Sequence, residues 1–362
     1  MKTIKKKAII CLAAGHSQKS LIIEAKSLGY YVLAIDVNEN AIGFNFADSF
    51  IVESTYEPRK IIKKLEKIID DFKWVGIINR SSGYPVVTSA ILSEYLNIPN
   101  IPVKSANTII NKDELKVACS INDIPVGNFN VFSTDDKIET EKFNYPLVVK
   151  PGLSLVGKKG ISVISNINQF KTGLEYAKKH TVNNKIIVEE YLPGPDYTFV
   201  CFVENSKIYP ICILDELNVE GLDGRIISRG YKTHLPTKDN KIEDEILKLS
   251  NLIVDKFKIS RSSLMTCFRV GNDNKLKLIE IHLDLGGDLL IEELFPKALS
   301  FDFETLAIEM LSGNWNKKIN TSVKPTAIFY EKGEALLNQR PFIILQAKTD
   351  KELEKKIIDK SL

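Results

Sequence analysis

The sequence lacks the cysteine pattern of a disulfide-stabilised scaffold. Its 362 residues include five cysteines with no C-x-x-C spacing. Most of them lie inside apolar stretches, where a thiol behaves as a small hydrophobic group. The five are Cys11, Cys119, Cys201, Cys212 and Cys267. This usage argues against a secreted disulfide-rich domain and predicts a cytoplasmic protein in a reducing compartment.

Long apolar runs and a strong charge of one sign are also missing. The first apolar run, Ala8–Ala14, stops at Gly15, is too short to span a membrane and lacks a small-residue cleavage site. Lys and Arg total 49 against 46 Asp and Glu, a formal charge of +3, and the longest basic run is Lys5–Lys7. We therefore expect neither a membrane nor a nucleic acid as partner.

A third absence concerns glycine. Ala8–Leu12 and Tyr31–Asp36 have the composition of buried strands, and a helical pattern lies between them, so the segment has the length of one βαβ unit. The turn after the first strand holds Gly15 alone, whereas a dinucleotide-binding fingerprint needs three glycines. The pattern therefore disfavours NAD binding and favours a structural βαβ unit in which Asp36 caps a turn or is solvated.

Strand–helix alternation continues to about residue 105 and predicts a doubly wound, Rossmann-like α/β domain over residues 1–105. Its further elements are expected at Phe50–Val52, Arg59–Phe72, Val75–Ile78 and Pro85–Leu96. With 44% hydrophobic and 26% charged residues, the chain is expected to fold throughout, and its length allows two or three domains.

After residue 105 the pattern changes to strands and hairpins, which predicts an antiparallel α+β region. A helix is expected over 111–122, with Asn111 as N-cap and Glu114 completing a capping box. Strands are expected at Pro146–Lys150, Gly160–Ile164, Lys185–Glu190, Tyr197–Val203, Ile208–Leu214, Leu264–Val270, Lys275–Ile281, Thr326–Tyr330 and Phe342–Leu345. Helices are expected at Asp244–Phe257 and from Asp350 onward.

Lys150 ends an apolar strand, so its stem is easily buried while its ammonium group needs an anionic partner, and a phosphate would serve. The loop that follows, Gly152–Gly160, is rich in glycine and lysine. Such a loop can set backbone N–H groups against phosphate oxygens. Taken alone, the loop equally fits an ordinary hairpin.

Two further segments fit a nucleotide. Lys112 lies in the first turn of a helix, where a cation opposes the helix dipole, and binding an anion would explain its place. Glu189–Asp196 leads from a buried strand into two acids and a turn, where a purine can use backbone groups and Asp196 can accept ribose hydroxyls. A solvated lysine and an exposed strand end are the alternatives.

In order and spacing these pieces resemble the ATP-grasp superfamily. Within it the chain resembles the carboxylate–amine ligases related to biotin carboxylase, carbamoyl phosphate synthetase and amino-acid ligases. The resemblance covers most of the chain and implies an ATP-grasp fold after the Rossmann-like domain, with a small lobe over 106–195 and a large lobe over 196–362. It implies ATP and Mg²⁺ as cofactors, a carboxylate activated as an acyl phosphate, and an amine that displaces the phosphate.

The resemblance also implies roles for single residues. The implied nucleotide-binding residues are Lys112, Lys150, Ser154, Gly157, Gly160, Glu189, Glu190, Leu192 and Asp196. Among them the two lysines would contact phosphates. Glu189 and Leu192 would frame the adenine, and Asp196 would hold the ribose. Glu280, on the expected strand Lys275–Ile281, would hold Mg²⁺.

Three positions depart from the family pattern. Cys267 stands where a glutamate is expected, and the usual glutamate, asparagine and arginine at alternate positions are here Glu280, His282 and Asp284. Asp284 reverses a charge that would stabilise phosphoryl oxygens. Either Asp284 shares the metal ion with Glu280, or Cys267, Glu280 and His282 form a softer site that could take zinc. Packed side chains are the alternative for Cys267 and His282.

The sequence thus predicts an ATP-dependent ligase that joins a carboxylate to an amine. The altered positions favour the alternative, a nucleotide-binding partner or regulator without catalysis on the same fold. Arg225, Arg229 and His234 lie in a polar stretch and are candidates for holding a substrate carboxylate, with a solvated loop as the alternative. Arg229 and Asp284 are the catalytic candidates. The sequence names neither substrate and leaves a homodimer open.

Overall fold

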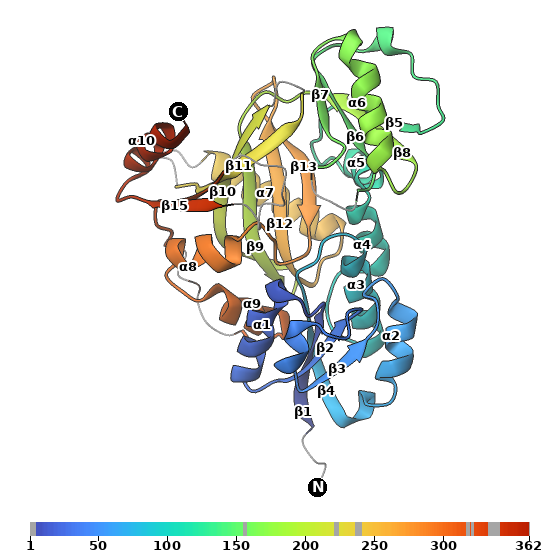
Figure 1. Ribbon diagram of the computed structural model, residues 1–362, viewed down its shortest axis with the longest axis vertical. Helices are drawn as coiled ribbons and strands as arrows, with labels where there is room; N and C mark the ends of the chain where they lie inside the picture. Colours follow the sequence, from blue (N-terminus) through green and yellow to red (C-terminus); the bar gives the residue numbers. More distant parts are fainter. Residues whose placement is uncertain are drawn as a thin grey trace.

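The computed structural model describes residues 5–154, 158–220, 224–235, 241–315, 319, 322–331 and 341–361. Figure 1 shows three sheets in this part of the chain: a small parallel one near the N-terminus, a large one in the middle, and a third in a lobe that stands apart. Among the described residues, none of the helices combines the length and the apolar character that crossing a membrane requires.

The N-terminal sheet is parallel, with the strand order β3-β2-β1-β4. Its strands are β1 (Lys6–Leu12), β2 (Tyr31–Asp36), β3 (Ser49–Val52) and β4 (Phe72–Asn79), and the helices around it are α1 (His16–Ser27), α2 (Pro58–Leu65) and α3 (Tyr84–Leu96). Two 3-10 turns, η1 (Ile42–Asn45) and η2 (Ile69–Asp71), complete this part. Asp36 accepts a hydrogen bond from the Ala14 N–H at 2.7 Å, so it closes the first turn as a structural βαβ unit requires.

Two helices, α4 (Val103–Ile110) and α5 (Lys112–Ile121), lead into the small lobe. Its antiparallel sheet has the order β5-β8-β6-β7, with one helix packed on it. The elements are β5 (Phe129–Ser133), the 3-10 turn η3 (Thr140–Lys142), β6 (Leu147–Pro151), β7 (Ser162–Ile164), α6 (Ile167–His180) and β8 (Lys185–Glu190). Ile186 and Val188 of β8 pack toward α6 in the lobe's own core, so the alternate residues Ile187 and Glu189 face the other way.

The large sheet is antiparallel, with the order β13-β12-β9-β10-β11-β14-β15. Its strands are β9 (Asp196–Glu204), β10 (Lys207–Glu220), β11 (Ile226–Thr233), β12 (Arg261–Val270), β13 (Leu276–His282), β14 (Thr326–Tyr330) and β15 (Phe342–Gln346). The helices of this part are α7 (Lys241–Lys256), the π-helix η4 (Leu290–Leu294), α8 (Phe295–Ala298), α9 (Phe303–Leu311) and α10 (Asp350–Ser361).

One hydrophobic core joins the N-terminal sheet to the large sheet. It includes Cys11 of β1, Leu21 of α1, Phe202 of β9 and Phe303 of α9, all buried. The small lobe packs around a separate core. The residue range proposed for the first domain, 1–105, ends inside α4, which belongs to a second core shared with β9, β12 and β13.

Several expected elements need correction. The helix expected over Arg59–Phe72 ends at Leu65, because Phe72 instead opens β4 and stacks on Tyr31, an example of tertiary packing overriding a helical pattern. The capping box is also wrong: Asn111 is the N-cap, but its side chain donates to the Asn107 carbonyl instead of capping the helix.

Helix α6 and strands β5 and β11 were not expected. Helix α6 contains Gly173, which weakens a helical pattern. A Cβ at this position would lie 2.4 Å from the Ile164 Cδ1 atom, so the Ile164 side chain would have to shift to admit one. Strand β11 lies in what was expected to be a polar stretch, because its sequence lacks the run of apolar side chains that marks a buried strand.

Candidate functional site

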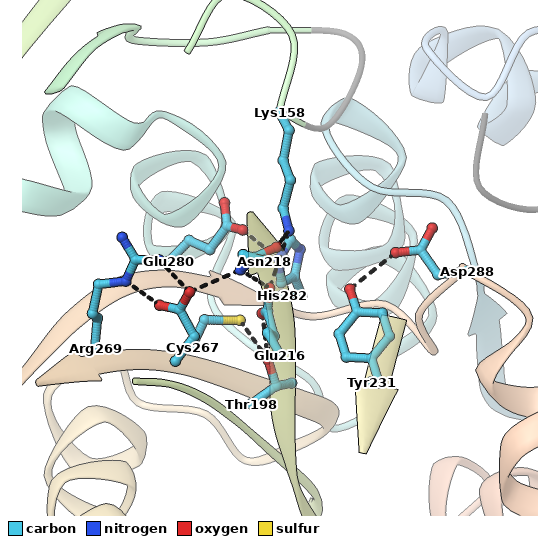
Figure 2. A network of polar contacts seen from close by, with 11 residues as sticks. Lys158, Thr198, Glu216, Asn218, Tyr231, Cys267, Arg269, Glu280, His282 and Asp288 are labelled. Atoms are coloured by element: carbon cyan, nitrogen blue, oxygen red, sulfur yellow. Dashed lines mark hydrogen bonds and ion pairs between the residues drawn. The ribbon is translucent and has the colours of Figure 1, made fainter. Parts of the chain in front are cut away.

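A row of polar side chains crosses four neighbouring strands of the large sheet. The strand register pairs Cys267 of β12 with Glu280 of β13 on one side and with Thr198 of β9 on the other. Thr198 donates a hydrogen bond to Glu216 of β10 at 2.8 Å, which extends the row by one strand. Because paired residues of neighbouring strands point to the same face, these groups lie side by side, as Figure 2 shows.

Glu280 pairs with two cationic groups. Its Oε2 atom lies 2.6 Å from Lys112 Nζ, and its Oε1 atom lies 3.2 Å from His282 Nε2. Burial raises the pKa of the Glu280 carboxyl, but Lys112 and His282 outweigh burial and hold it well below its usual range. Burial lowers the pKa of His282, but Glu280 and Cys267 outweigh burial and hold it well above its usual range. Lys112 thus ties α5 to β13 through an ion pair.

The Cys267 thiol is buried beneath the other side chains of the row. Its Sγ atom lies 3.3 Å from Thr198 Oγ1, and burial raises the pKa of the thiol although His282 acts in the opposite direction. One ligand atom each from Cys267, Glu280 and His282 lie within 4.8 Å of one another. The three residues that the sequence predicted as a soft metal site are therefore brought together.

Lys158, at the far end of the glycine loop, reaches the same face. Its ammonium group lies 3.1 Å from Glu216 Oε2 and 2.8 Å from Asn218 Oδ1 (Figure 2). Burial raises the pKa of Glu216, but Lys158 and hydrogen bonds from Thr198 and Asn218 outweigh burial and lower it. The loop thus contacts the large sheet through a lysine, as an anion-binding loop over this face would.

Asp196, predicted to hold a ribose, is engaged within the protein. Arg269 of β12 makes a forked ion pair with both of its oxygens, and Asn218 Nδ2 donates to Asp196 Oδ2 at 2.8 Å. The Arg269 guanidinium also lies over the Tyr191 ring, 5.9 Å from its centroid. Ribose binding at Asp196 stays a prediction that requires this ion pair to open.

In the small lobe, Glu189 lies between two buried lysines. Its Oε1 atom is 2.5 Å from Lys150 Nζ, and its Oε2 atom is 2.7 Å from Lys116 Nζ. Burial raises the pKa of Glu189, but the two lysines outweigh it and lower the pKa to about 2. Both carboxylate oxygens are therefore occupied, so an adenine at this position would contact backbone groups instead of the Glu189 side chain.

The remaining predicted nucleotide residues occupy the loop and the hinge. Gly160 has φ +83°, and a Cβ there would lie 2.9 Å from the His180 Cβ, so its backbone requires glycine. Ser154 is half-buried, and Gly157 lies outside the described residues. Glu190 accepts a hydrogen bond from Asn128, and Leu192 is buried.

Asp284 is not part of the donor group around Cys267. It is buried, and its Oδ1 atom accepts a hydrogen bond from the Gly286 N–H at 2.8 Å, which shapes the turn after β13. A different acid, Asp288, accepts a hydrogen bond from Tyr231 OH at 3.1 Å at the other end of the row (Figure 2). Sharing of a metal ion between Asp284 and Glu280 stays a prediction.

The predicted substrate residues do not converge. Arg225 lies over the Tyr176 ring of α6 and Arg229 over the Phe329 ring of β14, both at 5.0 Å from the centroid. His234 pairs with Asp215 at 2.8 Å and with Glu243 of α7 at 3.3 Å. Asp215 neighbours Glu216 along β10 and so points to the opposite face of the sheet. Because His234 pairs with Asp215, it does not join the polar row as a residue that holds a substrate carboxylate would.

The sequence analysis did not identify four of the candidate functional residues. Lys116 lies one helical turn after Lys112, a spacing that places both on one face of α5. Glu216 and Asn218 alternate along β10, beyond the point where the strand was expected to end. Arg269 lies two residues after Cys267 on β12, with its side chain on the same face. Each could have been found from the period of its element once the element's full length was known.

The buried Lys150 predicts a pH dependence of nucleotide binding. Burial lowers its pKa to about 8, with Lys116 and Lys112 acting in the same direction and Glu189 against them. A bound phosphate would favour the ammonium form, so binding takes up a proton above about pH 8. We expect ATP affinity to fall by about fivefold between pH 8 and 9, as followed by calorimetry. The Lys150→Arg variant, which keeps its charge, should show a flat profile; a flat profile in the unmodified protein would contradict the assignment.

The fold is shared with solved ligase and synthetase structures over nearly their whole length. The small lobe, the large sheet and the lysines between them form the ATP-grasp fold, as the sequence resemblance predicted. No protein-family model matches the chain. An L-amino acid ligase from Bacillus licheniformis superposes with a TM-score of 0.78 at 17% identity, covering 99% of this chain and 97% of the ligase. N5-carboxyaminoimidazole synthetase from Staphylococcus aureus, complexed with ADP, gives 0.76 at 16% identity, covering 99% and 98%.

In sequence, the chain is similar to curated formate-dependent phosphoribosylglycinamide formyltransferases. The protein of Prochlorococcus marinus subsp. pastoris is 29% identical over 200 residues, which is 53% of this chain and 49% of that protein. The protein of Sulfurovum sp. is 25% identical over 198 residues, with shares of 51% and 48%. The chain therefore spans about half the length of the curated relatives it matches.

Proposed function

We propose that the protein is an ATP-dependent ligase that activates a carboxylate as an acyl phosphate and joins it to an amine. One observation carries the proposal: Lys112 of α5, Lys150 of β6 and Lys158 of the glycine loop each pair with a carboxylate, namely Glu280, Glu189 and Glu216. The lysines interact electrostatically across the set, Lys112 with Glu189 and Lys158 with Glu280. Such a constellation binds a polyphosphate by exchanging carboxylate partners for phosphate oxygens.

The chemistry follows from what these groups can hold. A carboxylate oxygen attacks the γ-phosphorus of ATP, the bond from that phosphorus to the bridging oxygen breaks, and ADP leaves. The three ammonium groups stabilise the negative charge on the phosphoryl oxygens and on the departing ADP. An amine then attacks the acyl carbon, inorganic phosphate leaves, and the amine gives up a proton, so the products are an amide, ADP and phosphate.

Magnesium, which the fold family implies, does not fit the donor set that Cys267, Glu280 and His282 form in the described part of the chain. Mg²⁺ prefers oxygen ligands in near-octahedral geometry. Cys267, Glu280 and His282 offer one sulfur, one oxygen and one nitrogen donor. We therefore assign Mg²⁺ to the substrate, as the ion that accompanies ATP, and route no step through a protein-bound magnesium ion.

The relatives make formate and a phosphoribosylated amine the first substrates to test. This part of the proposal rests on similarity over about half of the relatives' length.

The three parts of the chain are proposed to have different roles, with 106–195 and 196–362 holding ATP and 1–105 closing the site beside them. A cytoplasmic location belongs to the same proposal, supported by five free and buried thiols.

An isotope experiment tests the ligase proposal. The protein is incubated with Mg²⁺, ATP and oxygen-isotope-labelled formate or other carboxylates, with hydroxylamine as a general amine acceptor. We expect a hydroxamate to form and one labelled oxygen to appear in inorganic phosphate, because the carboxylate oxygen that attacks phosphorus leaves with it. ATP binding without phosphate release for any carboxylate and amine pair would favour a non-catalytic nucleotide binder, for which none of the comparisons gives support.

A further inference from the structure

The donors at the centre of the site differ in kind from those of an oxygen-only metal site. Cys267 contributes sulfur, His282 an imidazole nitrogen and Glu280 a carboxylate oxygen, and these atoms lie within 4.8 Å of one another. They come from two neighbouring strands, so the backbone hydrogen bonds of β12 and β13 hold them in place. A sulfur, nitrogen and oxygen set with an open side is typical of zinc sites that bind a further ligand.

The contacts around the three donors resemble those that orient metal ligands. Glu280 divides its oxygens, with Oε1 directed to His282 and Oε2 held by Lys112 at 2.6 Å. Thr198 Oγ1 lies 3.3 Å from the Cys267 sulfur and donates its own proton to Glu216. Outer partners of this kind fix the orientation of a ligand and tune the ion it binds.

The three donor side chains differ in how far they are exposed to solvent. The Cys267 side chain is buried, whereas the His282 and Glu280 side chains keep 32% and 27% of their surface exposed. An ion seated on the three donors would therefore keep its remaining coordination position toward the side from which Lys158 enters (Figure 2). That is the side on which the proposed nucleotide phosphates would lie.

We propose that Cys267, Glu280 and His282 bind one Zn²⁺ ion, with the fourth coordination position left for water or a phosphate oxygen. Binding forms one Zn–S, one Zn–N and one Zn–O bond, and the thiol proton and any proton on the imidazole pass to solvent. Lys112 stays on the second oxygen of Glu280. Zinc binding by the protein alone is independent of ligase activity, so the metal and the proposed function can fail separately.

The test measures metal directly in untagged protein. Metal analysis of the full chain, purified without chelator, should give about one zinc ion per chain. After removal with a chelator, Co²⁺ should bind and give the near-ultraviolet sulfur-to-cobalt charge-transfer band of a thiolate ligand. Cys267→Ser should lose both the zinc and the band, while Cys201→Ser, a buried thiol one strand away on β9, should keep both.

A second variant protects the test from misfolding. If Cys267→Ser fails to fold, His282→Gln removes a nitrogen donor at a partly exposed position and should weaken zinc binding by at least tenfold. The proposal is overturned if the unmodified protein neither contains nor takes up zinc. It is equally overturned if bound cobalt lacks the charge-transfer band, or if Cys201→Ser loses the metal as readily as Cys267→Ser.

Discussion

We expect Lys150→Ala to weaken ATP binding by about 1.5–3 kcal/mol, roughly 10- to 150-fold, without unfolding the protein. The ammonium group of Lys150 is the buried cation at the end of β6, 2.5 Å from Glu189, and a phosphate would replace that carboxylate as its partner. The charge-assisted contact is lost in the variant. The fold should survive because Glu189 retains its second partner, Lys116, at 2.7 Å.

Titration calorimetry with ATP and Mg²⁺ measures this effect, and circular dichroism confirms that the variant is folded. Lys60→Ala is the matched control, since Lys60 is an exposed lysine on α2 whose ion pair with Glu57 is solvated. Its ATP affinity should equal that of the unmodified protein. A folded Lys150→Ala protein with unchanged affinity would remove Lys150 from the site and take away a main support of the ligase proposal.

The fold was largely predictable because its signals are local. Continuous apolar runs such as Ile9–Leu12 and Leu33–Ile35 are buried on both faces of a parallel sheet, which is the burial their composition predicts. The order of Lys112, Lys150 and Glu280 along the chain carried the family resemblance, and the structure pairs Lys112 with Glu280 and Lys150 with Glu189. The superposition on solved ligase and synthetase structures confirms the ATP-grasp fold.

The pairing of charges within the site was not predictable from the same signals. Glu189 was expected to frame an adenine, with an exposed strand end as the alternative, because the sequence does not show that Lys116 and Lys150 approach it from a helix and from another strand. His234 looked like a substrate ligand, because the register that puts Asp215 beside it is set by the pairing of β10 with β11. Contacts of this kind depend on tertiary structure, which a local pattern does not encode.

The largest effect on stability is expected at the buried Glu189. Its carboxylate compensates two ammonium groups that are each at least 95% buried, since Lys116 and Lys150 keep 2% and 3% of their surface exposed. Glu189→Gln preserves the shape and leaves both lysines without an opposite charge. Removing one partner from a buried ion pair costs about 3–5 kcal/mol, because the remaining charge is left desolvated.

Thermal unfolding followed by circular dichroism measures the loss, with Glu190→Gln as the matched control on the next residue. Glu190 is only half-buried and accepts a hydrogen bond from Asn128, so its substitution should cost no more than about 1 kcal/mol.

The pH dependence of stability gives a second test of the Glu189 carboxylate. Because the pKa of Glu189 is lowered from 4.5 to about 2, its contribution is fully present above about pH 4.5 and is lost as the pH falls toward 2. The Glu189→Gln variant should therefore lose less stability between pH 5 and pH 3 than the Glu190→Gln variant does. Equal stability of the two variants at neutral pH would contradict the expected cost and show that the lysines find other partners once the Glu189 charge is lost.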